Sequence, residues 1–421
     1  MAVLSTLFLL FIGLPVAIGA YSFTKEAALR NELFVTNSYN KLARPETGVT
    51  ITMQLNLLTL KELNIRDQYL TVVGYFVMRW DETSRLKWST NPTYSSDIQN
   101  IFCTENEIWV PPLMIENSVD NVGVISDNTV RIRVAANGKV TWSPADMFTT
   151  SCVTDVTYYP FDTQTCDIIV TSWGYTKAEM QFQVDSYVPL GVSNYQENGE
   201  WKYIGYTVTN GVENREAVKF FQIIYSLTFK RRSEFHILNS IAPMVSISLL
   251  ACFVFKLSAD AGEKVGFSLT ILLTSAVYLT LVSDSIPTTS LTTPYLTTYL
   301  ISLLGMEIVS VILTVMILDC YHTDGSTEIP KYLRLFMEKI ISRLICWKCK
   351  SGCSLKQSKN GNSVMDISEL KCDKEIDCYS VDNNEELSWQ NIAKMLDIFC
   401  FRLYLIAFIV ITVLFILKML I

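Results

Sequence analysis

The sequence predicts an extracellular β-sandwich followed by a four-helix transmembrane bundle. Half of the 421 residues are hydrophobic and only 18% are charged, a balance that suits a multi-pass membrane protein better than one soluble domain. Hydrophobic residues crowd the first twenty positions and then the region from Ile237 onward, whereas residues 21–235 resemble a soluble domain in composition. The chain therefore divides once, near Phe235.

The first segment, residues 1–20, is a predicted secretory signal peptide. It is apolar and ends in small residues, so cleavage is expected near Ala20. The alternative is a buried helix or a membrane anchor, but Pro15 interrupts the run and the chain turns polar from Tyr21. Residues from about 21 should thus be extracellular.

Four long stretches without charge, apart from one glutamate, can approach or cross a hydrocarbon core of ~30 Å. They cover residues 237–255, 265–283, 294–318 (interrupted by Glu307) and 403–417. The connection between the third and fourth stretches is rich in Lys and Arg, while residues 284–294 contain neither, as expected if the former is cytoplasmic. Both termini of the mature chain should then lie outside the plasma membrane.

These observations predict the domain organisation. We expect a signal peptide at 1–20, an extracellular β-sandwich at 21–235, three transmembrane helices at 236–321 (the third from about 294), a cytoplasmic loop with amphipathic helices at 322–394, and a fourth transmembrane helix at 395–421. The net charge of −7 argues against a nucleic-acid partner.

Alternating hydrophobic residues indicate strands in the extracellular part. In VTITMQLNL, the residues from Val49 to Leu57 alternate apolar and polar, which is typical of a half-buried strand. The segment VRIRVAANGKVTW alternates, turns at Asn137-Gly138 and resumes, which predicts a type I′ hairpin. A third run from Tyr225 to Phe229 lies just before the membrane. Several such strands favour a β-sandwich.

Three of the eleven cysteines, Cys103, Cys152 and Cys166, lie in the extracellular part, where a pair between two of them is expected. Cys152 and Cys166 enclose thirteen residues that contain Tyr159-Pro160-Phe161-Asp162. This C-x13-C segment resembles the signature loop of Cys-loop receptors, and the flanking TWSPADMFTTSC and SWGY are similar to the nicotinic branch. The resemblance implies a Cys152–Cys166 disulfide. Cys103 is then a buried free thiol or a partner for another chain.

The resemblance continues along almost the whole chain, through WDETSRLKW, IWVPP, KRRSEF and GEKVGFSLTILLTSAVYLTLVSDSIP. It implies a homo- or hetero-pentamer around a central pore, with a small-molecule agonist at the subunit interfaces and Na⁺ and K⁺ as permeating ions. An enzyme is not expected and no cofactor is implied, because the only histidines are His236 and His322, each at a membrane edge.

In the nicotinic branch the agonist's ammonium group sits among aromatic rings, whose faces attract cations. Trp173 matches the principal tryptophan, and Tyr75 falls where the complementary side usually has a tryptophan. Glu116 stands where a tyrosine is expected, Phe220 replaces another, and Tyr175 follows in SWGY. The capping loop, 207–219, lacks an adjacent cysteine pair. These departures argue against acetylcholine and leave a cationic ligand open, since Glu116 could supply charge. Without the motif, Trp173 would more simply be a core residue.

The second hydrophobic stretch carries a polar stripe at helical spacing. Residues three and four apart share one face of a helix, and this face holds Glu263, Gly266, Thr270, Leu273, Val277, Thr280 and Asp284. In five copies it would line a cation pore with acidic rings at both mouths and an apolar gate between them. Lys264 should point away from the Glu263 face. The alternative is an ordinary packed helix whose threonines bond to their own backbone.

The family resemblance also predicts a joint between the two domains. The Cys-loop residues Tyr159, Pro160, Phe161 and Asp162 should press on the connection around Ser285, Ile286 and Pro287. Arg232, just before the first crossing, is the expected charge partner of Asp162. Simple packing at a domain junction is the alternative.

Two further features are ambiguous. Glu307 lies in mid-membrane, so it is either part of a modulator site or a neutral carboxyl bonded to a neighbouring helix. Cys346, Cys349 and Cys353 have the spacing of zinc ligands but lack a fourth, so reduced or palmitoylated thiols are expected and no metal site is predicted.

The sequence thus predicts an extracellular-ligand-gated cation channel subunit, opened by agonist at the subunit interfaces. The alternative is a non-conducting assembly or binding subunit that needs partner subunits. The incomplete aromatic site favours the alternative, whereas the intact stripe favours the channel.

Overall fold

The computed structural model describes residues 21–284, 293–324, 329–337 and 388–420, apart from residue 121. The predicted signal peptide and the cysteines of the 346–353 segment lie outside these residues. The chain forms two compact units, one of Met1–Asp155 with Phe161–Arg232 and the other of Val156–Pro160 with Ser233–Ile421.

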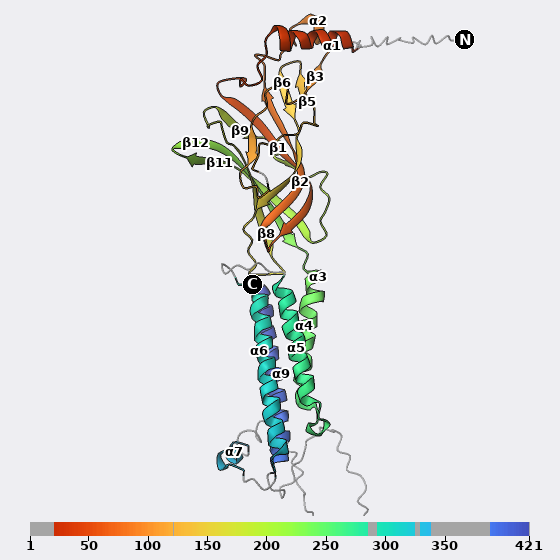
Figure 1. The fold of residues 1–421 in the computed structure, drawn as a ribbon, viewed down its shortest axis with the longest axis vertical. Helices are drawn as coiled ribbons and strands as arrows, with labels where there is room; N and C mark the ends of the chain where they lie inside the picture. The colour runs from red at the N-terminus through yellow and green to blue at the C-terminus, as the bar shows by residue number, and fades with distance from the viewer. Residues whose placement is uncertain (1–20, 121, 285–292, 325–328, 338–387, 421) are drawn as a thin grey trace, which may run out of the picture. The chain divides into compact units, whose positions relative to one another are not determined.

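The first unit is a sandwich of two β-sheets (Figure 1). The larger sheet has the order β10 (Leu190–Gly191), β1 (Val49–Asn64), β2 (Tyr69–Asp81), β6 (Lys139–Trp142), β5 (Ile132–Ala135) and β3 (Asn100–Cys103), with β7 (Ala145–Ser151) on β2 and β9 (Met180–Val184) on β1. The smaller sheet has the order β11 (Trp201–Arg215), β12 (Val218–Arg231), β8 (Thr163–Ser172) and β4 (Leu113–Ile115). Helices α1 (Phe23–Arg30), continued by a π-helical turn, and α2 (Pro92–Ser95) complete the unit.

The predicted alternation decides which side chains form the core. Along β1 the apolar residues from Val49 to Leu57 are buried, while Thr50 is exposed and the other polar residues between them are half-buried. Tyr225, Leu227 and Phe229 of β12 are fully buried in the same way. The ring centroids of Phe76 on β2 and Tyr225 on β12 lie 6.1 Å apart, so the two sheets meet through their apolar faces.

The hairpin between β5 and β6 is present, but the predicted type I′ turn is wrong. Such a turn needs positive φ at both central residues, and here Gly138 has φ of 87° while Asn137 does not have a positive φ. Instead the Gly138 N–H donates to the Ala135 carbonyl at 2.8 Å. A Cβ on Gly138 would lie 2.8 Å from Cα of Thr83, so only glycine fits here.

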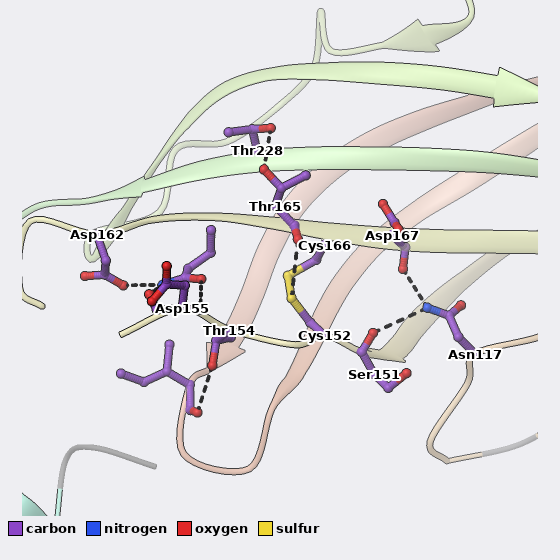
Figure 2. The surroundings of a disulfide bond; sticks show 12 residues. Asn117, Ser151, Cys152, Thr154, Asp155, Asp162, Thr165, Cys166, Asp167 and Thr228 are labelled. Atoms are coloured by element: carbon purple, nitrogen blue, oxygen red, sulfur yellow. Dashed lines mark hydrogen bonds between the residues drawn. A yellow bond between two sulfur atoms is a disulfide. The ribbon is translucent and has the colours of Figure 1, made fainter. Parts of the chain in front are cut away.

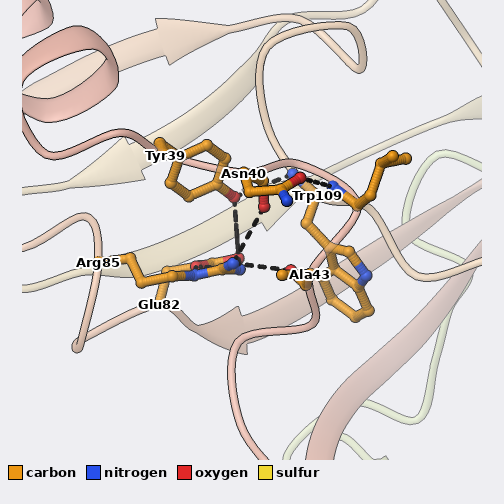
Figure 3. A network of polar contacts seen from close by, with 7 residues as sticks. Tyr39, Asn40, Ala43, Glu82, Arg85 and Trp109 are labelled. Atoms are coloured by element: carbon orange, nitrogen blue, oxygen red, sulfur yellow. Dashed lines mark hydrogen bonds and ion pairs between the residues drawn. The ribbon is translucent and has the colours of Figure 1, made fainter.

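A buried ion pair holds the WDETSRLKW segment (Figure 3). Glu82 is buried, and Arg85 Nε and Nη2 each donate to its carboxylate at 2.9 Å. The Tyr39 hydroxyl donates to Glu82 at 3.3 Å and accepts from the Trp109 N–H at 3.0 Å. Burial raises the pKa of the Glu82 carboxyl, and Arg85 opposes that rise. The pair therefore ties this turn to the chain that precedes β1.

Within its described residues, the second unit contains four helices long and apolar enough to cross a membrane, as predicted. The first crossing comprises α3 (Glu234–His236), a π-helical turn, α4 (Ala242–Cys252) and a 3₁₀ turn; the others are α5 (Lys264–Ser283), α6 (Tyr295–His322) and α9 (Trp389–Leu420). Helix α6 packs along α9, where the rings of Tyr299 and Phe415 stack at 4.3 Å. The predicted amphipathic stretch begins as α7 (Lys331–Phe336), and Leu333 and Trp389 both pack against the buried side chains of Met337 and Ile392.

Candidate functional site

The smaller sheet gathers the predicted aromatic residues around a cation of the chain itself. Trp173 directly follows β8 and is 62% exposed, and Phe220 lies on β12. The guanidinium carbon of Arg215, at the end of β11, lies 4.5 Å from the Trp173 ring centroid and 5.0 Å from that of Phe220. Both distances are typical of a cation–π contact. The aromatic site therefore already contains a positive charge.

Two carboxylates flank this guanidinium. Glu116, after β4, lies 3.2 Å from Arg215 Nη2, and Glu213 pairs with the same nitrogen. The side-chain amide of Gln222 donates to both carboxylates. Partial burial is the main reason that the pKa of the Glu116 carboxyl is raised. The Gln222 hydrogen bond lowers this pKa, the Glu213 charge raises it further, and the Arg215 charge lowers it. The structure thus brings Trp173, Glu116 and Phe220 together around Arg215.

Arg215 was not among the predicted site residues, although the β-hairpin pattern could have identified it. Glu213 and Arg215 are two positions apart on β11 and share a face. Glu213 is paired with Phe220 across the hairpin, and Gly211 with Gln222. The observed antiparallel register, with Arg215 opposite Val218, therefore places Arg215 beside the aromatic residues.

The remaining two predicted site residues, Tyr75 and Tyr175, make contacts of other kinds. Tyr75 is half-buried on β2 in the other sheet, between Asn56 of β1 and Ala145 of β7. The Tyr175 ring lies beneath Arg44 at 5.9 Å, and Arg44 is paired with Glu179 at 2.9 Å.

The Cys loop is closed by the Cys152–Cys166 disulfide, with the two Cα atoms 5.1 Å apart (Figure 2). At the base of the loop, Gln164 Nε2 donates to Asp162 at 2.7 Å and to the Asp155 carbonyl at 2.7 Å. Cys103, on β3, is a buried free thiol, and burial raises its pKa to about 12.

The predicted pairing of Asp162 with Arg232 is wrong, because Arg231 is the partner. Arg231 Nε donates to Asp162 Oδ1 at 2.8 Å and Nη2 to Oδ2 at 3.3 Å, and both side chains are 2% exposed. Arg232 instead pairs with Glu197 at the surface. The reason is the two-residue period of β12, which turns Arg231 inward with Phe229 and places the next residue outside. The sequence KRR alone does not show which of the two arginines faces the interior of the sandwich.

The part of the Cys loop that belongs to the helical unit contacts the helices directly. The Tyr159 hydroxyl and His236 Nδ1 are hydrogen-bonded at 3.0 Å, and their rings meet edge to face at 5.4 Å. The Tyr158 ring meets Tyr295 of α6 at 5.5 Å, and the Tyr295 N–H donates to the Thr157 carbonyl. The expected contacts with Ser285, Ile286 and Pro287 lie outside the described residues.

The predicted stripe occupies one face of the α5 segment and is exposed along its whole length in the single chain. All seven of its residues are exposed, including Leu273 at 67% and Val277 at 51%. The opposite face is buried at Lys264, Ser268, Ile271, Ser275 and Val282. Thr270 and Thr280 do donate to backbone carbonyls, at 2.8 and 2.7 Å, as the packed-helix alternative expected. Packing of α5 within this chain therefore leaves the stripe uncovered.

Lys264 turns away from Glu263, as predicted, and crosses to the last helix. Its side chain is fully buried and its ammonium pairs with Asp397 of α9. Glu263 is exposed at the beginning of α5. The positive charge of Lys264 is thus held inside the bundle, so it does not lie beside Glu263 on the stripe.

Glu307 is buried in α6 and accepts a hydrogen bond from Ser248 of α4 at 2.9 Å. The space beside it, lined by Ser268, Ile271 and Ser310 among others, is too small for a ligand. Of the two interpretations offered by the sequence, the geometry favours a carboxyl bonded to a neighbouring helix.

Comparisons with known proteins agree with this architecture. Residues 26–233 match the neurotransmitter-gated ion-channel ligand binding domain, and residues 240–378 match the neurotransmitter-gated ion-channel transmembrane region. The chain belongs to the neurotransmitter-gated ion-channel family. Its relatives in this family include acetylcholine receptor subunit beta of Rattus norvegicus, 32% identical over 78% of this chain and 68% of that protein.

Two further relatives in the family extend the comparison. Acetylcholine receptor subunit alpha-like 2 of Drosophila melanogaster is 30% identical over 79% of this chain and 62% of that protein. Acetylcholine receptor subunit alpha-1-A of Xenopus laevis is 30% identical over 87% of this chain and 79% of that protein. As a ligand-gated channel subunit, the chain is a membrane protein of a family whose members are not enzymes.

Proposed function

We propose that this chain forms a cation-selective pore in a pentamer of like subunits in the plasma membrane, with both termini outside. The observation that carries the proposal is the exposed stripe of α5, with acidic residues at both ends and apolar residues between them. Such a face is costly against lipid and suits the wall of a water-filled tube. Agonist binding between Trp173, Glu116 and Phe220 of one subunit and Tyr75 of the next would open it.

Leu273 and Val277 supply the proposed gate, because two apolar rings in a narrow tube exclude water. Leu273→Ser should wet the closed pore, giving agonist-free current or an increase of about tenfold in agonist sensitivity, equivalent to ~1.4 kcal/mol on the gating equilibrium. Whole-cell current from the chain expressed alone tests this. Leu272→Ser, about 100° round the helix, is the control and should change little. A Leu273→Ser channel that reaches the surface and behaves like the wild type would place the gate elsewhere.

The hydrogen bond between Tyr159 and His236 is proposed to help transmit opening to the first transmembrane helix. Tyr159→Phe keeps the ring contact and removes the bond, which is worth about 1 kcal/mol, so agonist sensitivity should change by about fivefold. Tyr158→Phe, which retains its ring contact with Tyr295, is the matched control. Equal effects of the two substitutions on the concentration–response curve would contradict a specific role for this bond.

The alternative function, a subunit that only assists assembly, is favoured by the occupied aromatic site. Expression of the chain alone separates the two proposals, since a pentamer that carries agonist-evoked current requires a complete pore and site. Pentamers without current, restored by a second subunit, would favour the alternative.

A further inference from the structure

Arg215 occupies the position that a ligand's cation would need. Its guanidinium lies over Trp173 and Phe220 at 4.5 and 5.0 Å, so both aromatic faces of the cluster are already in contact with a positive charge. Its side chain is only 18% exposed, whereas the Trp173 residue is 62% exposed. The guanidinium is thus enclosed while the outer part of the tryptophan remains open.

The Arg215 guanidinium is held by charge and by ring stacking, without the pair of hydrogen bonds to one carboxylate that would fix its orientation. Both Nη atoms of Arg215 are buried, yet neither makes a well-aligned hydrogen bond within the described residues, although Nη2 lies close to both carboxylates. The contrast is with Arg231, which donates two aligned hydrogen bonds to Asp162. Arg215 can therefore leave its position at a smaller cost in free energy than Arg231 can.

The charges around Arg215 favour an incoming cation over an anion. When all three groups are ionised, Glu116 and Glu213 contribute two negative charges and Arg215 one positive charge, leaving a net charge of −1. An anion could accept a hydrogen bond from Nη1 of Arg215, but the net negative charge would repel it. A cation that replaced Arg215 would instead contact two carboxylates and two aromatic faces.

We propose that Arg215 is a tethered cation that fills the subsite between Trp173 and Phe220, so that an organic cation binds there only by displacing it. The proposal rests on the proposed function in placing the ligand at this cluster. Because the guanidinium belongs to the same chain as the two rings, it competes with a free cation at an effective concentration in the millimolar range or above. If it is seated about 90–99% of the time, the apparent affinity for a free cation falls by about 10- to 100-fold.

The test is equilibrium binding of tetramethylammonium to the purified full-length protein, followed by tryptophan fluorescence. Arg215→Gln should lower the dissociation constant by about tenfold or more, because the subsite is vacated while both carboxylates remain. Arg215→Lys is a more conservative variant for folding. It should give a smaller decrease of the same sign, since an ammonium keeps the charge but loses the planar stack.

Two controls make the result specific. Arg44→Gln removes a second arginine that lies over an aromatic ring and pairs with a carboxylate, and it should leave tetramethylammonium binding unchanged. Adding Trp173→Ala to Arg215→Gln should abolish the gain, because the ring that receives the cation is gone.

An Arg215→Gln protein that binds the probe no more tightly than the wild type, or more weakly, would overturn the proposal, and so would an equal gain in Arg44→Gln. The readout needs no current. A gain in Arg215→Gln from a chain that does not conduct would therefore contradict the channel proposal alone, whereas a conducting chain without the gain would contradict only the role of Arg215.

Discussion

Glu263→Lys is expected to convert the current from one carried by cations to one that follows the chloride gradient. In the proposed pentamer, five Glu263 carboxylates make a negative ring at the cytoplasmic mouth, which lowers the energy of Na⁺ or K⁺ and raises that of Cl⁻. Lys264 does not neutralise this ring, since its ammonium is buried and paired with Asp397. Dilution potentials of surface-expressed channels should shift toward the chloride equilibrium potential, with Glu263→Gln intermediate.

Asp284 provides the matched control for this prediction. It is exposed at the other end of the same stripe, where the proposed vestibule is wider and better screened. Asp284→Asn should therefore reduce conductance and leave the reversal potential nearly unchanged. A wild-type current carried by chloride, or unaltered selectivity in Glu263→Lys, would contradict the assignment of this ring.

The second large effect is expected at the base of the Cys loop. Asp162→Ala leaves the Arg231 guanidinium in a site where its side chain is 2% exposed, although Arg231 keeps its ion pair with Glu200. Removing one member of a buried pair typically costs about 3–5 kcal/mol, because the other charge stays buried. We expect little surface protein and a marked fall in the thermal stability of the purified assembly, measured by size-exclusion chromatography after heating.

Arg232→Ala separates the two adjacent arginines. The Arg232–Glu197 pair has side chains 38% and 71% exposed, and such pairs contribute at most about 1 kcal/mol. This variant should express and assemble like the wild type. If Arg232→Ala lowered surface expression and thermal stability as much as Asp162→Ala, the buried Asp162–Arg231 ion pair would not be the contact that stabilises the loop.

The sequence predicts the elements of this protein well where a local pattern decides them. The alternation along β1 and the uncharged stretches of the four crossings each reflect burial that a short window reveals. The stripe of α5 follows from helical spacing alone, and so does the opposite direction of Lys264. The position of the turn at Asn137-Gly138 was predicted correctly but its type was not, because the hydrogen bond from Gly138 to Ala135 makes the loop one residue longer than the Asn-Gly pair indicates.

The contacts that pair distant charges were harder to predict. Arg231 and Arg232 are adjacent and chemically equal, so only the phase of β12 decides which one reaches Asp162. Arg215 was missed for a related reason. The family resemblance directs attention to aromatic positions, whereas this chain places a cation of its own among them through hairpin pairing, which no motif records.

The pair between Lys264 and Asp397 also constrains how the protein is made. The two residues are 133 positions apart in the chain, and synthesis proceeds at about 5–20 residues per second, so the lysine exists for roughly 7–27 s before its partner emerges from the ribosome. During that interval the second helix lacks the carboxylate with which Lys264 pairs in the complete chain. Insertion of the final helix therefore completes the burial of the second one, and a ribosome that stops before Asp397 leaves a helix bundle with an uncompensated charge, a feature by which cellular quality control could recognise the truncated chain.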